Sequence, residues 1–205
     1  RAFDAALYVG SRSRDYYSHF RYPVDRLFFS PHCIDTTRFK EGATDSARCE
    51  QRAILKVKED IPLVLFAGKL VPFKRPLDFI TGIAHLRREG IQAEAIIAGS
   101  GPMENEVKTF SASLNVPLHY LGFCNQSVMP GVYAAADCLV VPSMGRETWG
   151  LVCNEALACG TPIVVSDQVG CAPDLAVAGA SGHTFSMGDC KGLAGALAKT
   201  LKNPP

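Results

Sequence analysis

The sequence lacks an apolar run long enough to cross a membrane and lacks an excess of either charge. No run in its 205 residues approaches the roughly 18 apolar residues that a bilayer span requires. The net charge is +1, so the chain produces no strong field that would attract nucleic acid or a membrane surface. Nothing in the composition predicts a transmembrane segment or a nucleic-acid partner.

Clustered metal ligands are missing as well. None of the cysteines forms a CxxC pair, and no group of Cys and His has the spacing of a zinc site. Several cysteines lie in apolar runs, such as Cys138 in DCLVV. We expect reduced thiols in a cytoplasmic protein without a metal ion, with Cys138, Cys153 and Cys159 buried and unpaired. The eight cysteines are Cys33, Cys49, Cys124, Cys138, Cys153, Cys159, Cys171 and Cys190.

What the sequence does contain, from residue 61 onward, is a regular alternation of short apolar runs and helical stretches. A continuous apolar run such as LVLFA (63–67) is typical of a strand buried on both faces of a parallel sheet. Strands are predicted at 63–67, 93–98, 118–121, 138–141, 162–165 and 183–186. Helices are predicted at 76–88, 103–114, 128–135, 149–159, 174–178 and 191–202. The alternation predicts a three-layer α/β/α, Rossmann-like domain with a mainly parallel sheet of about six strands.

Residues 1–60 follow a different pattern. Strands are predicted at 6–10 and 26–31, with a polar helix at 11–19 between them. Residues 40–60 are charged and show no clear apolar period, so no element is predicted there. The sequence opens on Arg1 rather than on methionine and has no signal-peptide pattern, which indicates a piece of a longer protein.

Parallel sheets bind ligands beyond the carboxyl ends of their strands, so the loops at that edge are the candidates for chemistry. The loop GKLVPFKRP (68–76) begins with Gly68 and carries Lys69, Lys74 and Arg75. These cations are either solvated surface charges or ligands for a phosphate.

Two further loops at the same edge carry weaker signals. GSGP (99–102) is either a plain turn or a place where Gly99 and Gly101 let the backbone approach an anion before a helix N-terminus. It lacks the full GxGxxG spacing of a dinucleotide site. In GFCNQ (122–126), backbone groups around Phe123 are candidates for reading a nucleotide base.

The most informative stretch is ETWGL and the helix that follows it, where Glu147 and Glu155 are separated by seven residues. The first amides of that helix, at residues 148–151, have no intrahelical partner and favour an anion. An acid so close to an anion makes sense if it accepts hydrogen bonds from hydroxyls beside a phosphate. A nucleotide sugar supplies a diphosphate with hydroxyls on both sides. The alternative is that both glutamates are ordinary acids on a helix surface.

Taken together, these motifs resemble a known family. FAGKLVPFKRP, IIAGSGP, LHYLGF, VYAAADCLVVPS and ETWGLVCNEALACGTPIVVSD follow in the order seen in the C-terminal, donor-binding domain of retaining GT-B glycosyltransferases of the glycosyl transferases group 1 family. The resemblance covers about residues 61–203. It implies a glycosyltransferase whose donor is a nucleotide-diphosphate sugar, bound as substrate without a metal or other cofactor.

The resemblance also implies residue roles. Lys74 and Lys69 would bind the donor diphosphate, although Lys69 stands where the family usually has arginine and so loses the bidentate fork. Glu147 would contact the transferred sugar, and Glu155 the ribose. The donor would further contact the residues Gly68, Gly99, Gly101, Phe123, Thr148, Trp149, Gly150 and Leu151. In the family, glycine is common at the position of Thr148 and phenylalanine at that of Trp149.

The resemblance divides the chain after residue 39. Residues 1–39 are similar to the end of the partner, N-terminal domain and its linker, and residues 40–205 to the nucleotide-sugar-binding domain. The rest of the N-terminal domain is missing; in the family it binds the acceptor, and peripheral membrane association would run through it. Two alternatives remain: another GT-B enzyme, such as a sugar-nucleotide epimerase or a phosphorylase, and a nucleotide-sugar-binding module without chemistry.

Overall fold

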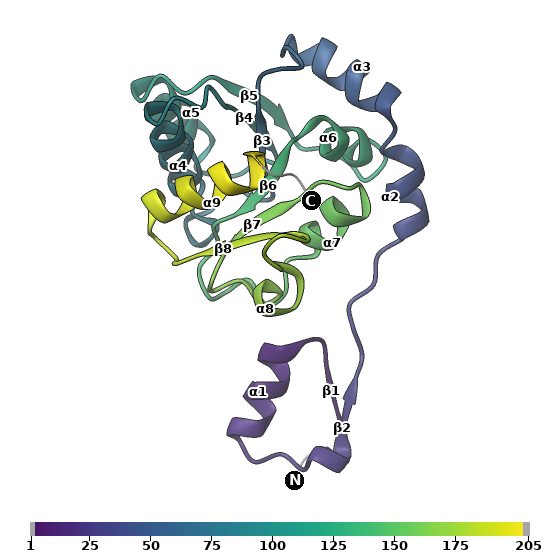
Figure 1. Ribbon diagram of the computed structural model, residues 1–205. Coiled ribbons are helices and arrows are strands. Elements are labelled where there is room, and N and C mark those ends of the chain that lie inside the picture. Colours follow the sequence, from purple (N-terminus) through teal and green to yellow (C-terminus); the bar gives the residue numbers. More distant parts are fainter. Residues whose placement is uncertain (1–2, 203–205) are drawn as a thin grey trace.

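The computed structural model describes residues 3–202, and its main body is a six-stranded sheet (Figure 1). All neighbouring strands are parallel, in the order β5-β4-β3-β6-β7-β8. The strands are β3 (Leu63–Ala67), β4 (Glu94–Ala98), β5 (Leu118–Gly122), β6 (Cys138–Val141), β7 (Ile163–Ser166) and β8 (Gly182–Phe185). The predicted fold class is confirmed, and the predicted strands pair in one sheet.

Helices cover both faces of this sheet, which gives the three layers (Figure 1). One face carries α4 (Pro76–Arg88), α5 (Glu104–Ser113) and α9 (Cys190–Lys202); the other carries α3 (Asp45–Leu55), α6 (Met129–Ala135) and α7 (Leu151–Ala158). Side chains alternate along each strand. Val64 and Phe66 of β3 therefore pack on the face covered by α4, α5 and α9, and Leu63 and Leu65 on the opposite face. Burial on both faces explains why the central strands β3 and β6 are continuous apolar runs, whereas the edge strands β5 and β8 carry polar residues.

A small N-terminal unit lies apart from the sheet at the end of an extended linker (Figure 1). It contains β1 (Ala6–Tyr8), α1 (Ser11–His19), a short 3-10 turn at Val24–Arg26 and β2 (Leu27–Phe29). The two strands pair in parallel, as a two-stranded sheet of their own. The start of α1 contacts the main body, where the Ser11 hydroxyl donates to Asp174 at 2.6 Å.

Residues 36–55 fold into two helices that the sequence pattern does not predict, α2 (Thr36–Gly42) and α3. Their caps are ordinary: the side chain of Asp35 accepts from Arg38 N and that of Thr44 from Ala47 N. The sequence of α3 shows no apolar period because the side chains of Arg48 and Arg52 point toward the main body. Helix α2 spans the predicted division after residue 39, and Phe39 is buried against Tyr133, with ring centroids 6.1 Å apart. The division itself stays a prediction.

Two helices differ from the prediction by two residues or more at an end, and three others by one residue. The helix expected at 149–159 begins at Leu151 and ends at Ala158. Gly150 precedes it with φ at 98°, a left-handed conformation that favours glycine and delays the helix start by two residues. The helix expected at 174–178 is the short α8 (Ala172–Leu175).

All eight cysteines are free thiols, as predicted. Cys138 and Cys153 are buried, but the expectation that Cys159 is buried is wrong, because it follows the last residue of α7 and is only half-buried. Burial raises the pKa of the Cys138 thiol well above its ordinary value, and that of Cys159 to about 12.

These thiols lead to a labelling prediction. In the native chain, iodoacetamide is expected to modify the exposed Cys33 and Cys49 first, because thiolate reactivity needs access as well as charge. Cys138, Cys153 and Cys171, which are buried, should become reactive only in denaturant. Peptide mass spectrometry after timed labelling measures the order, and labelling of Cys138 as fast as of Cys33 would contradict it.

Candidate functional site

A pocket of about 500 Å³ lies at the carboxyl ends of β3 and β4, between them and helices α6 and α7. This is the edge where a parallel sheet is expected to bind its ligand. Six residues predicted from the sequence line it: Gly68, Lys69, Gly99, Gly101, Phe123 and Glu155. They come from four separate segments of the chain, and the fold brings them together.

Glycine is required at Gly99 and at Gly101, where an added Cβ would meet backbone atoms at less than 3.0 Å. Gly99 follows β4 with φ at 153°, and a Cβ there would lie 1.9 Å from the Gly68 carbonyl oxygen. No side chain fits in that space, so the loops after β3 and β4 approach each other as bare backbone. At Gly68 and Gly99 the wall of the pocket is therefore made of main-chain groups.

Lys74 and Glu147 form an ion pair at the border of this pocket. The Glu147 carboxylate also accepts a hydrogen bond from the Ser143 hydroxyl at 3.2 Å. Lys74 lies next to the pocket wall, because a Cβ built on Gly68 would be 3.9 Å from its Nζ. Neither Lys74 nor Glu147 lines the pocket itself.

The loop from Thr148 to Gly150 connects Glu147 to α7. Within residues 3–202, the amides of residues 148–151 donate no hydrogen bond, but Trp149 and Gly150 are buried and none of these four residues lines the pocket. The side chain of Trp149 is turned away from the pocket: it is buried, lies 6.0 Å from the His32 ring, and donates through Nε1 to Asn154. Leu151 and Thr148 are exposed.

Glu155 projects from α7 into the pocket and is held there by Tyr133, whose hydroxyl donates to its Oε2 at 2.7 Å. Burial raises the pKa of the Glu155 carboxyl, while the Tyr133 hydroxyl and the charge of Arg38 oppose that rise. The pattern of loops after strands did not predict Tyr133, because it lies inside α6. A tyrosine in an otherwise apolar helix was the available signal, since a buried hydroxyl needs a partner.

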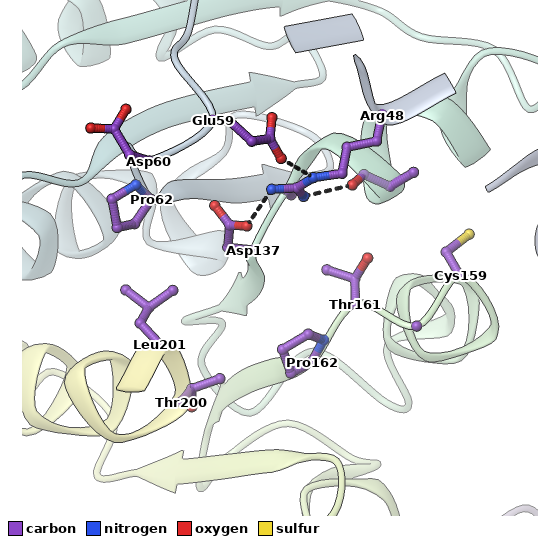
Figure 2. Close-up of a pocket in the computed structure, with 13 residues that line it drawn as sticks. Arg48, Glu59, Asp60, Pro62, Asp137, Cys159, Thr161, Pro162, Thr200 and Leu201 are labelled. Carbon is purple, nitrogen blue, oxygen red and sulfur yellow. Dashed lines mark hydrogen bonds and ion pairs between the residues drawn. The ribbon is translucent and has the colours of Figure 1, made fainter. Parts of the chain in front are cut away.

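A second hollow, of about 330 Å³, lies at the opposite edge, near the amino ends of β3, β6 and β7. Figure 2 shows Arg48 in its wall, bonded to Glu59 and Asp137. The same guanidinium also donates to the Ala134 carbonyl at 3.0 Å. Because two carboxylates already neutralise Arg48, this hollow offers no free cation for an anionic ligand.

Two features are absent from residues 3–202. No group of three or more His, Cys, Asp or Glu is arranged to hold a metal ion. None of the helices in this range combines the length and the apolar character needed to span a bilayer.

Comparison with known sequences identifies the family of this chain. Residues 47–205 match the family described as Glycosyl transferases group 1. The chain belongs to this family. The resemblance found in the motifs is therefore confirmed, and with it the assignment of the main body to the C-terminal domain of a GT-B glycosyltransferase.

Relatives of this group 1 glycosyltransferase chain come from archaea and bacteria. An uncharacterized glycosyltransferase of Methanocaldococcus jannaschii is 30% identical over 155 residues, which are 75% of this chain and 39% of the relative. A GDP-mannose-dependent alpha-(1-6)-phosphatidylinositol monomannoside mannosyltransferase of Mycolicibacterium smegmatis is 28% identical over 209 residues, or 98% of this chain and 54% of the relative. The chain thus spans about half or less of the length of such relatives.

Solved structures share the fold at lower identity. HepE of Anabaena, crystallised with UDP and glucose, has a TM-score of 0.80 at 21% identity and is matched over 97% of this chain and 54% of its own. Sucrose-phosphate synthase of Thermosynechococcus elongatus has a TM-score of 0.81 at 23% identity, over 98% and 50%. The C-terminal domain of a group 1 glycosyl transferase from Francisella tularensis has a TM-score of 0.68 at 18% identity, over 83% and 88%.

Proposed function

We propose that this chain is the donor-binding part of a glycosyltransferase that takes a nucleotide-diphosphate sugar and transfers the sugar with retention of configuration. The observation that carries the proposal is the pocket at the carboxyl edge of the sheet, with Glu155 and Lys69 inside it and the Lys74–Glu147 pair at its border. Relatives with this fold support it, since one is named as GDP-mannose-dependent and another was crystallised with UDP.

In this proposal the ribose hydroxyls donate to Glu155, deep in the pocket. The diphosphate lies between Lys69, Lys74 and the free amides of residues 148–151, and the sugar hydroxyls engage Glu147. Donor binding then exchanges partners: Lys74 leaves the carboxylate of Glu147 for the phosphates. Each member of the pair then has a new partner on the donor: a phosphate oxygen for Lys74 and sugar hydroxyls for Glu147.

The proposed chemistry is electrostatic. Charge develops on the departing diphosphate in the transition state, and cations and amide dipoles already aimed at that position stabilise it without reorganisation. The two lysines and the start of α7 supply that stabilisation in our proposal, without a metal ion. The acceptor is bound by a domain outside this chain, and the eight free thiols support a location in the reducing cytoplasm.

The chain as it stands is expected to bind the donor but to transfer nothing. Every proposed donor contact lies within residues 68–155, whereas the acceptor wall, which excludes water and positions the two reactants, lies outside it. A thermal-shift screen with UDP-, GDP- and ADP-sugars should show stabilisation by one of the three, and calorimetry should then give a modest, salt-sensitive affinity. The matching nucleoside monophosphate, which lacks the second phosphate, is the control and should bind more weakly. No shift with any of the three would overturn the proposed function.

A further inference from the structure

Tyr133 is a fully buried residue of α6 whose single polar atom reaches the pocket. Its ring packs edge-on against Phe39, and its backbone carbonyl accepts a hydrogen bond from the Thr161 hydroxyl at 2.7 Å. The Phe39 contact thus holds the ring, and the Thr161 bond holds the main chain of α6. Its hydroxyl donates to Oε2 of Glu155, and both residues line the pocket.

Packing alone does not explain this tyrosine. Phenylalanine would fill the same space in the core, and a buried hydroxyl is unfavourable unless it finds a partner. The hydroxyl has one acceptor, the Glu155 carboxylate, and this is the single hydrogen bond that the carboxylate accepts within residues 3–202. Oε1 of Glu155 is thus left for a ligand.

The bond from Tyr133 is the main polar contact that the surroundings of Glu155 provide. Burial disfavours its charged form. The nearby cations are Arg38 of α2, whose guanidinium is engaged by Gln126 at 3.1 Å, and Lys69 in the pocket wall. The other titratable neighbours are the thiols of Cys124, Cys153 and Cys159, which carry no positive charge. Among these groups Tyr133 alone donates a hydrogen bond to the carboxylate.

We propose that Tyr133 is a positioning residue for donor binding: its hydroxyl fixes the plane of the Glu155 carboxylate, so that Oε1 is presented to the ribose hydroxyls. This inference rests on the proposed function, in which Glu155 is the ribose ligand. A carboxylate held in one orientation loses less rotamer freedom when the ligand binds.

The test compares two tyrosine variants, with UDP as the probe and GDP and ADP in parallel. Tyr133→Phe removes the hydroxyl and keeps the ring. Tyr120→Phe is the matched control, because the Tyr120 hydroxyl also donates to a carboxylate, that of Glu104, at 2.7 Å, outside the pocket. At neutral pH, Tyr133→Phe is expected to raise the Kd by about 3- to 10-fold, and Tyr120→Phe to leave it unchanged.

The pH profile separates positioning from packing. Because the Tyr133 hydroxyl lowers the pKa of Glu155, its removal raises that pKa further. Nucleotide binding by Tyr133→Phe should therefore be lost at a higher pH on the acid side than in the parent chain. Protonation of the nucleotide phosphate is common to both proteins and cancels in the comparison. In a Glu155→Gln background, Tyr133→Phe should change neither the Kd nor the profile.

A ligand-free measurement keeps this inference distinct from the proposed function. A carbon-13 NMR titration of the Glu155 carboxyl should give a higher pKa in Tyr133→Phe than in the parent chain. If the parent chain binds none of the nucleotides, the proposed function fails, whatever the titration shows. If it binds and Tyr133→Phe leaves both Kd and Glu155 pKa unchanged, the inference fails alone. A Tyr133→Phe chain that does not fold would also overturn it, because the hydroxyl would then serve stability.

Discussion

Replacing Asp137 with alanine is expected to lower the free energy of unfolding by about 3 kcal/mol, the lower end of the range for removing one partner of a buried ion pair, because Arg52 is buried while the Asp137 side chain is 26% exposed. Asp137 immediately precedes β6, and its carboxylate joins three parts of the chain. It accepts from the Leu63 amide at 2.7 Å, from Arg48 at 2.9 Å and from Arg52 at 3.3 Å. The variant would loosen β3 and α3 together.

The cost arises mainly at Arg52, which is only 2% exposed. Its guanidinium donates to the carbonyls of Ala135, Lys58 and Ile61, and its Nε lies 3.0 Å from a Glu59 oxygen without the geometry of a hydrogen bond. Without Asp137 this buried cation keeps its carbonyl partners but loses the less exposed of the two carboxylates beside it. A charge left in that state is expensive.

Urea unfolding followed by circular dichroism measures this effect. Glu59→Ala is the matched control, because it removes the other carboxylate of the same cluster, whose side chain is 62% exposed. Its expected cost is below about 1 kcal/mol, as for solvent-exposed ion pairs. Equal losses in the two variants would show that burial does not set the contribution of this cluster.

The second large effect concerns the two glutamates. Glu155→Ala is expected to weaken the bare nucleoside diphosphate and its sugar alike, by about 1–3 kcal/mol, because both ligands carry the ribose. Glu147→Ala should weaken the nucleotide sugar only. The bare diphosphate should bind Glu147→Ala at least as tightly as the parent chain, because Lys74 loses its competing carboxylate.

Calorimetry of both variants with both ligands tests this division of roles. Glu106→Ala, which removes an exposed acid from α5 outside the pocket, is the control and should leave both affinities unchanged. The division is wrong if the two variants lose bare-diphosphate binding equally, or if Glu147→Ala spares the sugar nucleotide. Loss of both ligands from Glu106→Ala would point to a general electrostatic effect rather than to contacts.

The central strands of the main body could be predicted because a strand that is buried on both faces is a continuous run of apolar residues. The strand LVLFA has no exposed face, so every residue in it is apolar. Helices α2 and α3 could not be predicted in this way. Arg48 and Arg52 occupy the inner face of α3, where they form ion pairs with Asp137 and donate hydrogen bonds to carbonyls far along the chain. A helix whose buried face is ionic has no apolar period to find.

The sequence by itself determined the parallel sheet, the edge at which a ligand would bind, and the residue types gathered in the loops there. Only the tertiary structure decided which of those residues share the pocket, that Lys74 pairs with Glu147, and that Tyr133 holds Glu155. The physical reason is the distance along the sequence between the residues that come into contact. The spacing of apolar residues records burial within a single element, whereas Lys74 and Glu147 stand 73 residues apart and meet because two loops leave neighbouring strands at the same edge.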